Sequence, residues 1–268
     1  MLTSRALLVP HLPTLLVDEH RRHHTPMLEA LREQAERLQA ERPEIIVVVS
    51  ARWDSDGPFH VDVGRRHGTL TDYPGFGVEV RYDCAGHPAL ARALVEAGEK
   101  AGVHVGAARR GVDSGVTVPL HFLMPRHLVP VVPLSLARRP VSECRAWGAV
   151  IQGVLAARPE RVAFVVGGLL SHATHDWNLR RDVPEARDFD EHALRALRSG
   201  AWDDLRAGDP AMVERAQPEA GLRHLDVLRG FLSADVPGQV RCYEAAPGVG
   251  AALVEFEVPG VVGATATG

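Results

Sequence analysis

The run of β-branched residues IIVVV at positions 45–49 is the feature that most constrains the fold. It does not alternate apolar with polar residues, so it predicts a strand over residues 44–50 that is buried on both faces. Similar apolar runs occur at residues 5–9, 128–134 and 161–166. Segments with helical period separate them, at residues 26–41, 88–101 and 142–157. This alternation predicts an α/β fold with a central mixed, largely parallel sheet flanked by helices.

The carboxyl edge of this sheet is where we expect a site, because open α/β sheets bind their ligands there. Gly167 and Gly168 follow the strand expected at 161–166, and their missing side chains allow close approach to the backbone. The more polar residues 176–215 are expected to form short helices that cap this edge. One continuous helix is expected over residues 219–232. No linker or repeat divides the chain, so residues 1–268 are expected to form a single domain.

Charge and composition argue against several classes of protein. The chain has a formal net charge of -4, which disfavours binding to a nucleic-acid backbone. Its apolar runs are shorter than the roughly 20 residues of a membrane-spanning helix, and its start is too brief for a signal peptide, so we expect a cytoplasmic protein without membrane contact. The three cysteines form no CxxC pair, which predicts reduced, mostly buried thiols.

Four stretches carry a resemblance to a known family: VPHLP at 9–13, VVVSARW at 47–53, DSGVTVPL at 113–120 and GGLLSHATH at 167–175. Supporting similarity occurs at 187–205, 219–223 and 243–253. In this order and spacing, the chain resembles the catalytic subunit of the class III extradiol ring-cleaving dioxygenases over nearly its whole length. The family's known members hold Fe(II) between two histidines and one carboxylate, which leaves open positions for a catechol-type substrate and oxygen.

By resemblance, His11 corresponds to the first metal-binding histidine and Glu219 to the carboxylate ligand, although Glu214 and Glu244 also compete for the second role. His172 corresponds to the family's acid-base histidine, a role suited to an imidazole with a pKa near ambient pH. From the residues alone, His11 reads equally as a histidine in a surface turn, and Glu219 as a carboxylate that stabilises a helix N-terminus.

Two positions depart from the family pattern. Arg52 occupies the place of the second metal-binding histidine, and a guanidinium cannot ligate iron because it only donates hydrogen bonds. Ser114 replaces a histidine that contacts substrate. One consequence would be a site with no cofactor, in which Arg52 forms a bidentate pair with Glu219. The other would be a restored ligand set, with His60 or His175 as the third metal ligand.

Three functions therefore remain open. The first is an Fe(II)-dependent dioxygenase that cleaves a catechol- or aminophenol-type ring, with His172 as acid-base group and with Arg52, Ser114 and His175 contacting substrate. The second is a metal-free, catalytically degenerate family member that holds a small anionic ligand through Arg52. The third is a hydrolase or lyase that uses His172 and Glu219 without redox chemistry; GxSxG, P-loop and HExxH motifs are all missing from the sequence. The family resemblance implies a homodimer, or a complex with a small α-type subunit.

Overall fold

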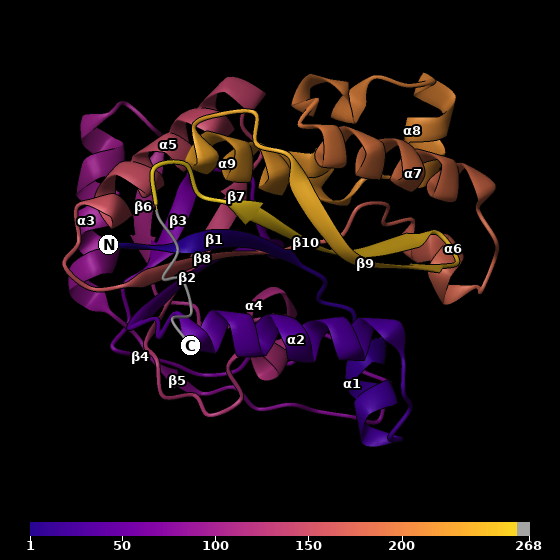
Figure 1. Ribbon diagram of the computed structural model, residues 1–268, viewed down its shortest axis with the longest axis horizontal. Coiled ribbons are helices and arrows are strands. Elements are labelled where there is room, and N and C mark those ends of the chain that lie inside the picture. The colour runs from indigo at the N-terminus through magenta and orange to yellow at the C-terminus, as the bar shows by residue number, and fades with distance from the viewer. Residues whose placement is uncertain (262–268) are drawn as a thin grey trace, which may run out of the picture.

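The computed structural model describes residues 1–261, and its centre is an eight-stranded sheet with the strand order β6-β3-β7-β2-β8-β1-β10-β9 (Figure 1). The sheet strands are β1 (Leu2–Val9), β2 (Ile45–Ser55), β3 (Phe59–Asp62), β6 (Val105–Ala108), β7 (Val131–Ala137), β8 (Val162–Gly167), β9 (Gly238–Ala246) and β10 (Val249–Glu257). A separate small sheet pairs β4 (Arg66–His67) with β5 (Cys84–Ala85). The four central strands, β7, β2, β8 and β1, run parallel, whereas β3 is antiparallel to β7 and β10 is antiparallel to β1. The fold is thus the expected mixed, largely parallel α/β architecture.

Helices cover both faces of the sheet (Figure 1). The helices are α1 (Pro13–His20), α2 (Pro26–Ala40), α3 (Pro88–Lys100), α4 (Ser114–Leu123), α5 (Val141–Ala156), α6 (Thr174–Asn178), α7 (Pro184–Ser199), α8 (Pro210–Ala216) and α9 (Arg223–Leu232), with short 3-10 turns η1 (Trp202–Arg206) and η2 (Glu219–Leu222). In Figure 1, α1, α2 and α4 lie below the sheet, and α3, α5, α7 and α9 lie above it.

Strand β2 shows why its apolar run does not alternate. Val47 and Val49 pack into the core on the side of α5 and α9, whereas Ile46 and Val48 pack into the core on the side of α2 and α4. Successive side chains of a strand point to opposite faces, so a strand covered on both sides requires apolar residues at every position. All four side chains are fully buried.

The start of α2 follows its sequence signals. Thr25 is extended, and its hydroxyl accepts a hydrogen bond of 3.2 Å from the Leu28 backbone N–H, while Pro26 occupies the first helical position. This arrangement satisfies one of the free N–H groups at the helix start, and proline removes another. The expected helix over 26–41 is therefore confirmed to within one residue.

The helix expected over 219–232 is instead broken after its first turn. Ala220, Gly221 and Leu222 all have positive φ angles, of 48°, 59° and 61°, so η2 and α9 are separate elements. The left-handed region is costly for residues with a Cβ atom, so surrounding contacts must hold this turn. Short elements that the sequence patterns did not indicate are α1, α6, β3, β4 and β5.

Residues 176–215 form a packed layer on β9 and β10. Helix α7 contacts both strands, and its residue Asp190 is buried. The Asp190 carboxylate accepts hydrogen bonds from the Ser171 N–H and hydroxyl and from the Tyr243 hydroxyl, at 2.8 to 2.9 Å. Burial raises the pKa of Asp190 to about 6, against the lowering effect of these bonds. The segment is thus anchored to the loop that carries His172.

The remaining expectations on the whole chain have mixed outcomes. The cysteines are free, with Cys84 and Cys144 buried and Cys242 partly buried, as expected. Over residues 1–261, every helix is too short or too polar to cross a membrane. The coil expected after Gly263 lies outside the described residues.

Candidate active site

Three parallel strands bring the candidate residues together at their carboxyl ends. His11 follows β1, Arg52 lies near the end of β2, and His172 lies in the loop after β8. The Gly168 N–H donates to the Val9 carbonyl over 3.1 Å, which joins the ends of β1 and β8. At Gly167, an added Cβ would lie 1.8 Å from the Gly115 carbonyl oxygen, so glycine is required for α4 to approach β8.

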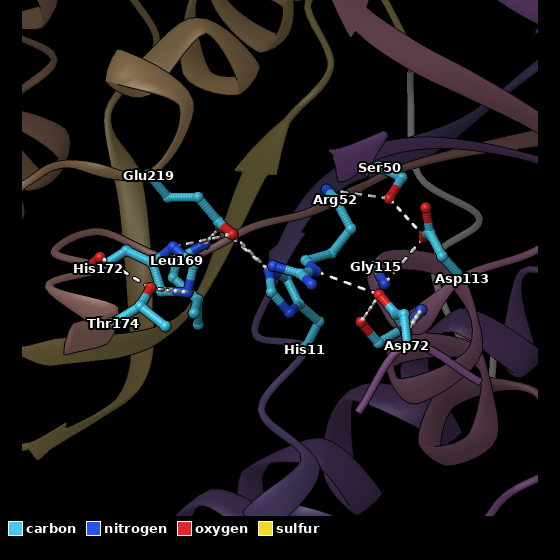
Figure 2. Close-up of polar contacts among 11 residues, drawn as sticks. His11, Ser50, Arg52, Asp72, Asp113, Gly115, Leu169, His172, Thr174 and Glu219 are labelled. Carbon is cyan, nitrogen blue, oxygen red and sulfur yellow. Dashed lines mark hydrogen bonds and ion pairs between the residues drawn. The ribbon is translucent and has the colours of Figure 1, made fainter. Parts of the chain in front are cut away.

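The centre of the site is a closed pair between His11 and Glu219 (Figure 2). The His11 Nε2 lies 2.9 and 3.0 Å from the two Glu219 carboxylate oxygens, and both side chains are buried. Burial alone would lower the pKa of His11, but the Glu219 charge and hydrogen bond outweigh it and raise that pKa. Burial would raise the pKa of Glu219, yet His11 holds it well below its usual range. These opposite shifts favour the charged form of both partners, an imidazolium and a carboxylate.

Glu219 is held in place by the loop after β8. Its backbone N–H donates to the Leu170 carbonyl over 2.9 Å, and its carboxylate accepts the Leu169 N–H over 2.6 Å. These contacts explain the left-handed turn of η2, because a continuous helix would carry the carboxylate away from β8. The sequence predicted Glu219 at the start of a helix. In the structure, the loop after β8 and the His11 side chain hold it in place.

His172 lies on the open side of the pair. Its side chain is 18% exposed, its Nδ1 lies 3.6 Å from a Glu219 oxygen, and its Nε2 lies 3.4 Å from the Thr174 hydroxyl. Burial lowers the pKa of His172, and the charges of His11 and Arg52 lower it further, against Glu219. His172 is thus a neutral, reachable imidazole beside a charged pair, an arrangement suited to accepting a proton.

Arg52 does not pair with Glu219 as the metal-free hypothesis required; it pairs with Asp72. The Arg52 Nε donates to an Asp72 oxygen over 3.1 Å, and Ser114 donates to the same carboxylate from its N–H and its hydroxyl at 2.9 and 2.8 Å (Figure 2). The Arg52 backbone N–H is bonded to Ser50. The expected bidentate pair is therefore wrong: Glu219 bonds to His11 and Leu169, and the Arg52 guanidinium bonds to Asp72.

Neither proposed substitute ligand joins the pair. His60 lies in β3, stacks on Trp53 with ring centroids 5.9 Å apart, and donates its backbone N–H to Ser135. His175 is exposed on α6. Within residues 1–261, no three His, Cys, Asp or Glu side chains are grouped so that they could hold a metal ion. His11 and Glu219 have the donor chemistry of iron ligands, whereas the Arg52 guanidinium only donates hydrogen bonds and cannot ligate Fe(II).

The sequence patterns missed several parts of the site. Asp72 comes from an irregular segment, and nothing in its spacing pointed to Arg52. His224 is fully buried next to Gly168, where an added Cβ would lie 2.6 Å from the imidazole ring. Burial lowers the pKa of His224 to about 4, against Glu219. A buried histidine in a helix gives no sequence signal that separates it from core packing.

The sequence of the chain matches a known protein family. Residues 5–254 match the family model described as the catalytic LigB subunit of aromatic ring-opening dioxygenase. The chain belongs to this family, as the motifs at residues 9–13 and 167–175 indicated.

Curated relatives bear names of the same class. The chain is 26% identical over 200 residues to a 4,5-DOPA dioxygenase extradiol of Beta vulgaris, covering 72% of each protein. It is 22% identical to the 2-aminophenol 1,6-dioxygenase beta subunit of a Pseudomonas species, covering 94% of this chain and 92% of that one. The family and these relatives support extradiol-type chemistry on aromatic compounds. An uncharacterized Escherichia coli K12 protein shares the fold, with a TM-score of 0.69 at 21% identity over 94% of this chain and 99% of that one.

Proposed function

We propose that this chain is a metal-independent member of its family, which binds an aromatic ring bearing an anionic group and takes a proton from a ring hydroxyl. The observation that carries this proposal is that the Arg52 guanidinium pairs with Asp72 while His11 and Glu219 form a closed pair; by family resemblance, Arg52 takes the place of a metal-binding histidine. The Arg52 guanidinium would supply a fixed positive charge in place of the charge that a metal ion supplies in other members of the family. The aromatic substrate class rests on the family and the relatives' names.

Arg52 keeps donors available for a ligand. Its ion pair with Asp72 uses only Nε, and neither terminal nitrogen bonds to another described side chain or backbone group. The Arg52 side chain is 36% exposed. A guanidinium with both terminal nitrogens available can bind a carboxylate in bidentate fashion. Asp72 fixes the direction in which that fork points, which lowers the entropy lost on binding.

His172 is the group that would move a proton. It is partly exposed, it carries no strong hydrogen bond, and the charge of Arg52 reaches it. A ring hydroxyl beside His172 would pass its proton to the imidazole, and the resulting phenolate would be stabilised by His11 and Arg52. Glu219 keeps His11 protonated and oriented for this task.

A cavity with aromatic walls is formed in part by residues close in sequence to the site. Phe76 and Trp177 stack with ring centroids 5.7 Å apart, and they line a cavity of about 420 Å³ together with Thr14 and Arg180. Thr14 follows His11 by three residues, Trp177 follows His172 by five, and Phe76 follows Asp72 by four. Three residues of the cavity wall therefore lie in the segments that carry the polar site, and the stacked rings offer an apolar surface on which an aromatic ring could pack.

The test compares 3,4-dihydroxybenzoate with catechol, which lacks the carboxylate, by calorimetry in the presence of a metal chelator. The wild-type chain should bind the acid at least about tenfold more tightly, the usual scale of a charge-assisted contact. Arg52→Gln should abolish this preference, whereas Arg32→Gln, on the exposed face of α2, should retain it. Equal binding of both ligands by the wild-type chain would rule out the role of Arg52.

The second candidate is metal-dependent extradiol cleavage, which the names of the relatives favour. It would need His172 or another histidine to move into the ligand set. Protein purified anaerobically and supplied with Fe(II) should, by our proposal, hold far less than one metal ion per chain, both as wild type and as His11→Ala. About one iron per chain that falls sharply in the variant, with oxygen uptake on catechols, would establish the dioxygenase instead.

A further inference from the structure

We propose that a second site, lined by arginines, binds a small molecule carrying several phosphate groups. The site is an open cavity of about 530 Å³, lined by segments 62–70 and 109–111 and by α3. Five arginines line it: Arg65, Arg66, Arg92, Arg109 and Arg110. It shares no lining residue with the cluster around His11 and Glu219.

The positive charge of this cavity is largely unneutralised. Arg65, Arg66, Arg92 and Arg109 form no ion pair with any residue of the described chain. Arg110 is the exception, because its guanidinium pairs with Asp113 and lies over the Trp53 ring. The formal net charge of -4 for the whole chain therefore conceals a local concentration of positive charge.

The one carboxylate of the lining, Asp62, is turned inward and acts as a scaffold. It is 1% exposed, and it accepts the backbone N–H groups of Gly64, Arg110 and Gly111 at 2.8 to 2.9 Å. Burial would raise the pKa of Asp62, but these bonds and His67 hold it far below its usual range. This buried carboxylate ties the two arginine-bearing loops together and leaves their side chains free.

A second carboxylate, Asp83, stands near the rim. It is occupied by Thr69, whose N–H and hydroxyl donate to it at 2.8 and 3.0 Å, although the charge of Arg66 also reaches it. Asp62 and Asp83 together carry at most two negative charges, against four guanidinium groups without an ion pair. An added anion with several charges would balance the remainder.

The size and geometry of the cavity select a small ligand. A volume of about 530 Å³ lies in the range of small-molecule sites, and the arginines come from three separate elements around one hollow. Guanidinium forks bind phosphate oxygens in bidentate fashion. A duplex would require an extended positive face, which the net charge of this chain opposes. Polyphosphate chemistry, as in inorganic pyrophosphate or a nucleotide tail, fits best.

The test uses the full chain and inorganic pyrophosphate as the probe, with calorimetry at physiological ionic strength. We compare wild type with Arg66→Ala/Arg109→Ala and with a charge-matched control, Arg32→Ala/Arg198→Ala, in which both arginines are exposed and unpaired in the described structure. The wild type should bind pyrophosphate saturably, and the cavity variant should bind it at least about tenfold more weakly. The control should match the wild type.

Two outcomes would overturn the proposal. The first is no saturable binding, or an equal loss in both double variants, which would indicate only a diffuse electrostatic field. The second is tighter binding of a DNA or RNA oligonucleotide than of pyrophosphate, with the same dependence on Arg66 and Arg109, because the cavity would then be part of a nucleic-acid surface. Circular dichroism of each variant verifies that the fold is intact.

Discussion

Replacing Glu219 by Gln tests the central pair of the site. The substitution keeps the shape of the side chain but removes its charge. One carboxylate oxygen of Glu219 bonds both the Leu169 N–H and the His11 Nε2, so an amide oxygen at that position can keep both bonds, while the NH2 group faces His11 at the other position. The lost charge of the bond to His11 predicts a loss of about 2 kcal/mol in the free energy of unfolding. The full cost of an unpaired buried charge is avoided because His11 can release its proton.

The loss of stability caused by Glu219→Gln should depend on pH in a direction that the two pKa shifts determine. The depressed pKa of Glu219 adds stability above its unfolded value of 4.5, which is lost as the pH falls through the folded pKa. The raised pKa of His11 adds stability below its unfolded value of 6.5, which is lost as the pH rises through the folded pKa. The difference between wild type and Glu219→Gln is therefore largest between pH 4.5 and 6.5.

Urea unfolding over a range of pH measures this difference, and NMR titration of His11 gives an independent measurement. In the variant the pKa of His11 should fall below its ordinary value, because burial is no longer opposed. Glu214→Gln is the control: Glu214 is exposed, and its loss should change stability by less than about 0.5 kcal/mol. A cost below about 1 kcal/mol for Glu219→Gln, or a cost that does not vary with pH, would refute the charged pair.

Two further predictions concern the neighbours of this pair. Arg52→His should supply a third metal ligand beside His11 and Glu219. After incubation with Fe(II), metal analysis should find bound iron in this variant and none in the wild type or in Arg52→Ala. Iron bound to Arg52→Ala would show that other residues complete the set of metal ligands. Gly167→Ala should destabilise the chain by more than about 2 kcal/mol, because its Cβ would lie 1.8 Å from the Gly115 carbonyl oxygen. Urea unfolding measures this loss, with Gly153→Ala as the control, since an added Cβ at Gly153 meets no atom within 4 Å. An equally small loss of stability in both variants would show that α4 can move away from Gly167.

The main elements of the fold could be predicted because their signals are local. The doubly buried strand β2 and the capped start of α2 follow from residues adjacent in sequence, such as Thr25 and Pro26. Strand β3 was missed because four residues between glycine- and proline-rich segments are too short to show a period. The break at Ala220 was missed because two of its three left-handed residues carry a Cβ atom, and tertiary contacts hold the turn, among them the bond of Glu219 to the loop after β8 and that of Arg206 to the Gly221 carbonyl.

The sequence predicted which residues form the site, but not which of them pair with one another. Family motifs placed His11, His172 and Glu219 in one region, and the structure brings these three side chains together. The partner of Arg52 could not be predicted, since Asp72 belongs to a segment without periodicity and the contact depends on tertiary packing. The roles of these residues in metal binding and catalysis remain predictions that the proposed experiments address.

The position of β1 in the sheet has a consequence for how the chain is made. β1 precedes the other strands of this sheet, yet its two neighbours are β8 and β10, which begin at residues 162 and 249. His11 likewise finds its partner 208 residues later. One edge of β1 therefore stays unpaired until β8 is made and the other until β10 is made, and an unpaired apolar strand edge is a template for aggregation. A chain cut short before β10 would expose one edge of β1, and the His11–Glu219 pair cannot form before residue 219 is made.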